Sequence, residues 1–158
     1  MSDITEKHIQ LILDGLYMAD RCRIQILHSG SISIGFGSMV HHGNAKLRDT
    51  YYGEWEIGSF HNAWRLVSGS RVLCTGDTDE YQAQISESEL EKNLSKRIRR
   101  VYNLSTLDVR VDFGSGVCLD FLSVGDAEDE SFHIFCPNEQ WLAFTPNRGW
   151  LLGTDPLH

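Results

Sequence analysis

The stretch RIQILHSGSISIGFGS at residues 23–38 aligns without a gap on DVRVDFGSGVCLDFLS at residues 108–123. Apolar residues coincide in the two stretches, and a Ser/Gly turn falls in the same place in both. The coincident pairs are Ile24/Val109, Ile26/Val111, Ile32/Val117, Ile34/Leu119 and Phe36/Phe121. Strict alternation around a short Gly/Ser loop is typical of a β-hairpin with one buried face. We therefore predict the same hairpin in both stretches.

A second pair of stretches repeats in the same order. EWEIGSFHNAWRLVSGSRVLCTG at residues 54–76 aligns on SFHIFCPNEQWLAFTPNRGWLLG at residues 131–153. The matching pairs include Trp55/Phe132, Ile57/Ile134, Trp64/Trp141, Arg71/Arg148 and Gly76/Gly153. Alternating apolar residues between turn signals predict a three-stranded meander in each copy, and a repeat of this length indicates two copies of one supersecondary unit. We expect the same strand order in both.

A helix is predicted in front of each hairpin. Residues 4–17, with Ser2 or Thr5 as caps, and residues 86–101, with Ser86 or Ser88 as caps, have apolar residues at helical spacing. The two stripes are Ile9, Ile12, Leu13 and Leu16, and Leu90, Leu94, Ile98 and Val101. The predicted fold is therefore α+β, a single domain of residues 1–158 formed by two pseudo-repeated helix-plus-antiparallel-meander units. The first unit covers about 4–79, the second about 86–156, and residues 77–86 connect them.

Composition places the chain among compact proteins. With 158 residues and 41% hydrophobic residues, a chain of this size buries about 70% of its unfolded surface. The sequence has neither a signal-peptide pattern nor an apolar run near the roughly 18 residues of a membrane helix. We therefore expect a cytoplasmic protein that does not contact membranes. In that compartment Cys22, Cys74, Cys118 and Cys136 are expected as reduced thiols.

Charge narrows the class of partner. The formal net charge is −8, which argues against direct nucleic-acid binding because phosphate recognition needs a positive surface. The imbalance is concentrated in residues 101–158, which contain nine acidic residues but only Arg110 and Arg148 as basic ones. Such an acidic segment is suited to attracting a basic partner.

Motifs for catalysis or cofactor binding are weak. His41 and His42 are adjacent, and His28 and His61 stand alone, so the histidines predict solvated loops rather than a metal site. The Gly/Ser turns lack the GxxxxGK[ST] pattern of a phosphate loop. Trp64 and Trp141 fit core positions better than a ligand cleft, with their indole N–H groups bonded to backbone carbonyls. We predict no catalytic residues, no metal and no cofactor.

Two acidic clusters are the candidate partner-binding residues. Each follows a predicted strand, where a loop is expected. They are Asp126, Glu128, Asp129 and Glu130, and Asp77, Asp79 and Glu80. One interpretation is a solvated loop; the other is a surface complementary to a basic protein.

The segments SxLEKNLSKRIRRV and LDVRVDFGSGVCLDF, followed by a later Trp, lie within residues 88–153. In these segments the chain resembles bacterial immunity proteins of polymorphic toxin and contact-dependent growth inhibition systems. The resemblance implies a non-enzymatic antitoxin that binds one cognate toxin C-terminal domain, often a cationic nuclease, and occludes its active site or substrate surface. The alternatives are an enzyme of unrecognised type and a small-ligand-binding regulatory domain.

Overall fold

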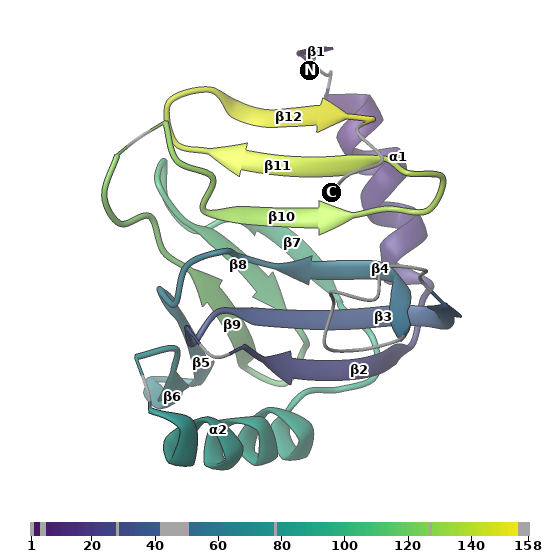
Figure 1. Ribbon diagram of the computed structural model, residues 1–158. Helices are drawn as coiled ribbons and strands as arrows, with labels where there is room; N and C mark the ends of the chain where they lie inside the picture. Colours follow the sequence, from purple (N-terminus) through teal and green to yellow (C-terminus); the bar gives the residue numbers. More distant parts are fainter. Residues whose placement is uncertain are drawn as a thin grey trace.

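The structure, a computed structural model, describes residues 2–3, 6–27, 29–41, 51–77, 79–126 and 128–154, without the side chains of residues 2, 3 and 80. The fold is α+β, as predicted, and is built on two antiparallel sheets (Figure 1). We call the seven-stranded sheet, of order β1-β12-β11-β10-β4-β3-β2, sheet A. The five-stranded sheet, of order β6-β5-β9-β8-β7, is sheet B.

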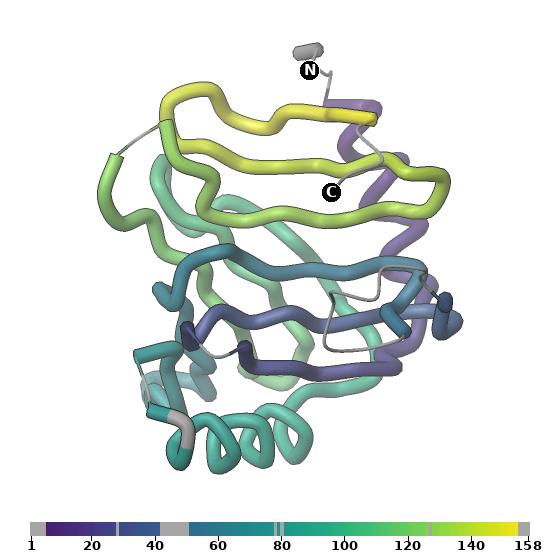
Figure 2. The backbone as a smooth tube through the Cα atoms, viewed as in Figure 1, coloured from purple at the N-terminus to yellow at the C-terminus, as the bar shows by residue number. Residues whose placement is uncertain are grey.

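Sheet A is made from the two ends of the chain, and sheet B from its middle (Figure 2). The strands of sheet A are β1 (Ser2–Asp3), β2 (Arg21–Ile26), β3 (Ile32–His41), β4 (Tyr51–Gly58), β10 (Phe132–Phe135), β11 (Trp141–Thr145) and β12 (Gly149–Gly153). Those of sheet B are β5 (Trp64–Ser68), β6 (Arg71–Thr75), β7 (Arg100–Asn103), β8 (Val109–Asp112) and β9 (Val117–Phe121). The helices are α1 (Glu6–Tyr17) and α2 (Glu80–Asn93).

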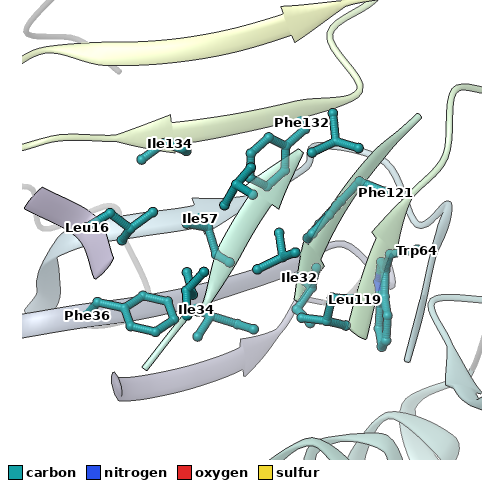
Figure 3. Packing of buried hydrophobic residues seen from close by; sticks show 14 of the residues in the cluster. Leu16, Ile32, Ile34, Phe36, Ile57, Trp64, Leu119, Phe121, Phe132 and Ile134 are labelled. Atoms are coloured by element: carbon teal, nitrogen blue, oxygen red, sulfur yellow. The ribbon is translucent and has the colours of Figure 1, made fainter. Parts of the chain in front are cut away.

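One hydrophobic core lies between the two sheets, whose strands cross in Figure 1. Alternation along each strand directs every second side chain inward. Sheet A contributes Ile34, Phe36 and Ile57, and sheet B contributes Leu119 and Phe121, all fully buried (Figure 3). The predicted burial of the alternating hairpin residues in one core is confirmed, because Val109 and Val111 are fully buried too and Val117 packs against the same cluster.

The N-terminal helix was predicted closely and seals one side of the sandwich. Leu13 and Leu16 of α1 are buried in the core. The hydroxyl of Tyr17 accepts a hydrogen bond from the backbone N–H of Val101 at 2.8 Å. Because β7 is an edge strand, this bond occupies a donor that would otherwise be open to another strand.

The second helix begins and ends earlier than predicted. It starts at Glu80, capped by the carboxylate of Asp79, which accepts the N–H of Gln82 at 2.8 Å. It ends at Asn93, so Ile98 and Val101 are buried but not helical. Their spacing continued the helical stripe, yet residues 100–103 pair with β8 instead. Tertiary strand pairing here overrides the local helical pattern.

No helix in the described ranges is long and apolar enough to cross a membrane.

The first repeated stretch does form two hairpins, β2–β3 and β8–β9, but their registers differ. Ile24 faces Ile34 in the first hairpin. Val109, which aligns with Ile24, faces Phe121 rather than Leu119. The alignment therefore matches the alternation of the strands, although the cross-strand pairs are shifted by two residues. A two-residue shift keeps the same side chains inward, because the side-chain period of a strand is two.

The predicted repeat of the second stretch is wrong in its strand order. Strands β10, β11 and β12 form a continuous meander in sheet A. The corresponding strands divide, since β4 pairs in sheet A whereas β5 and β6 pair in sheet B. Trp64 and Trp141 therefore lie in different sheets. The loop at residues 59–63 carries the chain across to the other sheet, while residues 136–140 make a tight turn closed by a bond from Cys136 N–H to the Gln140 carbonyl.

The repeat persists locally as a Trp–Gly contact in two hairpins. The indole of Trp64 lies against Gly76, and the indole of Trp141 against Gly153. A Cβ atom at either glycine would overlap the ring beside it. Trp64 is buried and donates its indole N–H to the Gly30 carbonyl at 2.7 Å, as the sequence predicted. The likeness thus stops at single hairpins and does not extend to their arrangement.

We predict that Gly76→Ala lowers the free energy of unfolding by about 2 kcal/mol, because overpacking a full core forces side chains and backbone apart. The added methyl would overlap the Asn62 carbonyl oxygen and the Trp64 indole nitrogen. Gly69→Ala is the control: its φ is positive, but nothing lies within 4 Å of an added Cβ, so about 1 kcal/mol of backbone strain is expected. Urea unfolding of both variants measures the difference. Equal losses would contradict the Trp64–Gly76 packing.

Candidate functional site

The first predicted acidic cluster lies in the loop between β9 and β10. Asp126, Glu128 and Asp129 are exposed there. Asp126 organises the loop, since its carboxylate accepts the N–H of Glu128 at 3.0 Å and its carbonyl accepts the N–H of Asp129. The Glu128 carboxylate is hydrogen-bonded to the side chain of Asn147 in the turn between β11 and β12. The three carboxylates are therefore presented to solvent, and hydrogen bonds fix those of Asp126 and Glu128.

Glu130, the fourth predicted residue, differs from the other three. Its carboxylate lies 2.7 Å from Nδ1 of His133, whose side chain is only 5% exposed. The His133 ring is also stacked on the Phe135 ring, with 4.3 Å between the ring centroids, and its centroid lies 4.7 Å from that of the Phe60 ring. Glu130 thus pairs with a buried ring at the base of the loop, which distinguishes it from the other three carboxylates of the cluster.

The second predicted cluster begins α2. Asp77 and Asp79 are exposed, and Asp79 is the helix cap described above. The side chain of Glu80 lies outside the described residues. A carboxylate at this position stabilises the helix through its first turn. The structure therefore gives Asp79 a structural reason to be acidic, as a helix cap.

Three large apolar side chains are exposed in loops attached to the acidic loop. They are Phe60, Leu107 and Val124, which are 58%, 50% and 51% exposed. Val124 belongs to the acidic loop itself. We call Asp126, Glu128 and Asp129, together with these three residues, the acidic end; the β9–β10 loop lies on the left in Figure 1.

Hydrogen bonds hold the acidic end together. The N–H of Leu122 bonds to the Ala63 carbonyl, which joins the loop that carries Phe60. The N–H of Ser123 bonds to the Asp108 carboxylate at 2.8 Å, which joins the loop that carries Leu107. Contiguous exposed apolar patches with a polar rim mark interaction sites, and these hydrogen bonds place the three loops that carry exposed apolar residues beside one another. The sequence singled out the charges but not the apolar residues, because only the tertiary structure brings the three loops together.

A buried carboxylate, Glu56, occupies the outer face of sheet A and is 4% exposed. It accepts the hydroxyl of Ser33 at 2.8 Å and the N–H of Gly53 at 2.7 Å, and Nε of Arg23 lies 3.2 Å away. Burial raises the pKa of Glu56, whereas Arg23, the two hydrogen bonds and His133 oppose that rise. A carboxyl with a raised pKa can act as a proton donor or acceptor.

Glu56 and His133 come from opposite halves of the chain and were not predicted. They occupy equivalent positions in the aligned stretches at 54–76 and 131–153, between matching apolar residues. Strands β4 and β10 pair directly, with Ile57 opposite Ile134, so both side chains point away from the core on neighbouring strands. The sequence held one signal for these residues: each is a polar residue between two apolar residues at matching positions of the repeat. Only the pairing of β4 with β10 shows that the two side chains lie on the same face of sheet A.

A second buried carboxylate, Asp120, lies on the outer face of sheet B and is fully buried. Arg65 donates to it from Nε at 2.9 Å. Arg110 donates twice, from Nε at 2.6 Å and from Nη2 at 2.9 Å. These bonds raise the pKa of Arg110. The Asp120 carboxylate on β9 is thus paired with guanidinium groups from both neighbouring strands, β5 and β8. The alternation in the sequence did not distinguish Asp120 from other outward residues.

The cysteines and histidines offer little for chemistry among the described residues. All four cysteines are free, and burial raises the pKa of Cys74 to about 11 and that of Cys136 to about 12. A raised pKa keeps the thiol protonated and weakly nucleophilic. No group of three or more His, Cys, Asp or Glu side chains is placed to hold a metal within the described ranges. The predicted loop residues His28 and His42 lie outside those ranges.

We predict that Asp120→Ala lowers the free energy of unfolding by about 2–3 kcal/mol. The substitution leaves the guanidinium groups of Arg65 and Arg110 without the carboxylate that pairs with both of them. The matched control is Asp20→Ala, which removes an ion pair of similar length, 2.7 Å to Arg97, between two exposed side chains. Exposed pairs contribute little, so urea unfolding should show almost no change for the control. Equal effects of the two substitutions would show that burial of Asp120 does not matter.

Glu56 gives a pH prediction with a definite sign. A carboxyl whose pKa is raised in the folded state binds its proton more tightly there than in the unfolded chain. Its contribution to stability is therefore greatest at low pH, and it declines as pH rises from the ordinary carboxyl pKa through the raised value. Urea unfolding between about pH 4 and 7 should show a smaller decline for Glu56→Gln than for the parent. Glu54→Gln, an exposed neighbour on β4, serves as control, and parallel profiles for parent and Glu56→Gln would refute the prediction.

Comparison of the chain with protein families, with curated proteins and with solved structures finds no match. What the protein does must therefore be inferred from its own surfaces and buried groups.

Proposed function

We propose that this chain is an immunity protein that binds a cationic toxin domain, such as a nuclease, through the acidic end. The observation that carries the proposal is the combination of exposed carboxylates with three exposed apolar side chains on hydrogen-bonded loops. Protein interfaces commonly combine apolar anchors with a polar rim. The resemblance in residues 88–153 agrees with this function.

The charges and the apolar residues have separate roles in the proposal. An acidic surface attracts a basic partner over a distance and raises the association rate, more strongly at low salt. In a nuclease the complementary surface is the groove that binds phosphates, so the carboxylates would occupy the place of the substrate. Phe60, Leu107 and Val124 would then supply the desolvated contacts that slow dissociation.

An enzyme is the alternative that one observation favours. Glu56 and His133 lie on neighbouring strands from the two halves of the chain, and the pKa of Glu56 is raised. Against it, both side chains are buried, and both have partners in Ser33, Gly53 and Glu130. The two functions separate experimentally, because Glu56→Gln should abolish an acid–base activity and leave protection from a toxin unchanged.

The first test identifies the partner. The untagged chain is recovered from its native host to identify the protein bound to it. The neighbouring reading frame is inspected for a toxin C-terminal domain, and that domain is co-expressed with the chain in cells that it otherwise kills. The expected result is a stable complex with a basic domain and survival of the cells. A chain that neither binds nor protects against that domain would refute the proposal.

The second test locates the surface. We predict that Glu128→Lys combined with Asp129→Lys weakens binding to the toxin domain by about tenfold, mainly through slower association, because charge complementarity governs encounter. Asp126 and Glu130 are kept, since one organises the turn and the other pairs with His133. Association rates at two salt concentrations measure the effect, and the variant's circular dichroism should match the parent's.

The matched control places the same charge change on α1. Glu6→Lys combined with Asp14→Lys alters two exposed residues of that helix, which lies on the right in Figure 1, away from the β9–β10 loop. This variant should associate at the rate of the parent, apart from the small effect of net charge. If both variants are equally impaired, or neither is, the acidic end is not the interface.

A further inference from the structure

The outer face of sheet B carries two cross-strand rows of side chains. The inward side chains Leu66, Leu119, Val111 and Val101 are buried in the core, so their neighbours along each strand point outward. Strand register aligns these neighbours across β5, β9, β8 and β7. The first row is Arg65, Asp120, Arg110 and Tyr102, and the second is Val67, Cys118, Asp112 and Arg100. We call this surface the arginine face.

The sign of the arginine face is opposite to that of the whole chain. It contains Arg65, Arg100 and Arg110, and Arg99 adjoins it with Nη1 4.0 Å from the Asp112 carboxylate. Four guanidinium groups thus face two carboxylates, although the chain has a net charge of −8. One of these carboxylates, Asp120, is fully buried beneath its two arginines. What reaches solvent from this pairing is guanidinium, with the Arg65 side chain 37% exposed.

Three of the four guanidinium groups, those of Arg65, Arg110 and Arg100, are held in place before any partner arrives. Asp120 fixes Arg65 and Arg110 through Nε. Arg100 lies over the ring of Tyr102, 4.6 Å from its centroid. A planar guanidinium matches the two oxygens of a carboxylate, and prior ordering reduces the entropy lost on binding.

A carboxylate partner fits this face better than a nucleic acid. Base recognition on an open sheet uses exposed aromatic rings for stacking, whereas the single ring in the two rows, Tyr102, is covered by Arg100. A long polyanion would also meet the repulsion of an acidic chain. A short acidic segment of a larger protein avoids most of that repulsion, because charges beyond about 8 Å are screened at physiological salt.

We propose that the arginine face binds an acidic segment of a partner protein, whose carboxylates pair with Arg65, Arg99 and Arg100. This proposal does not rest on the proposed immunity function, since it concerns another surface and a partner of opposite charge. The segment would lie across the strands along the rows. Asp120 would act as a positioning residue that holds Arg65 toward the carboxylates.

The test uses fluorescently labelled decaglutamate as probe, with the full chain, at low salt. We predict that Arg99→Glu combined with Arg100→Glu weakens decaglutamate binding at least about tenfold, because two attractive contacts become repulsive. Both side chains are exposed, so the fold should be retained, as circular dichroism would show. The matched control, Lys7→Glu combined with Lys92→Glu, makes the same charge change at exposed positions on α1 and α2 and should bind within about twofold of the parent.

Three outcomes would overturn the proposal. The parent chain fails to bind decaglutamate at low salt, or both double variants lose binding equally, which indicates general charge attraction. A labelled ten-residue oligothymidine is the third arm: tighter binding of this probe than of decaglutamate, lost in the Arg99/Arg100 variant, would assign the face to single-stranded nucleic acid instead. Loss of decaglutamate binding confined to the Arg99/Arg100 variant supports the proposal.

Discussion

The structure depends on one constraint: each of the two sheets has an apolar face that must be removed from water, and each supplies the cover for the other. Burial of apolar surface contributes most of the stability of such a fold. Phe36 and Ile57 from sheet A meet Leu119 and Phe121 from sheet B in this layer. The two helices close its sides, and Tyr17 of α1 also occupies the edge of β7. The loop at residues 59–63 connects β4 of sheet A to β5 of sheet B, so the chain passes from one sheet to the other there.

The same constraint decides where charge can be buried. The inward faces are filled with apolar side chains, so the buried carboxylates Glu56 and Asp120 lie on the outer faces. There each finds several donors, which offsets the loss of water. Glu56 is held by Arg23, Ser33 and Gly53, and Asp120 by two arginines. Through polar contacts, these two carboxylates link neighbouring strands on the outer faces of the sheets, which do not face the hydrophobic core.

Charge of opposite sign is thereby separated on one small molecule. The acidic end presents carboxylates beside Phe60, Leu107 and Val124, while the arginine face presents guanidinium groups held by Asp120. A net charge of −8 conceals this separation, because it averages over both surfaces. Under the two proposals, a basic partner would be attracted to the acidic end and an acidic segment to the arginine face. The proposed functions follow from this arrangement and can be tested separately.

The sequence by itself determined the elements that depend on local pattern. Alternation between Val109 and Phe121 determined the hairpin and its buried face, and the stripe in residues 4–17 determined the first helix. It also located the exposed acidic loop. Only the tertiary structure decided what lies beside what: the division of β4 from β5 between two sheets, the strand at Val101 in place of a longer helix, and the pairs at Glu56 and Asp120. The physical reason is that a period-two pattern specifies which side chains point inward, whereas the partner strand is chosen by the burial of both sheets together.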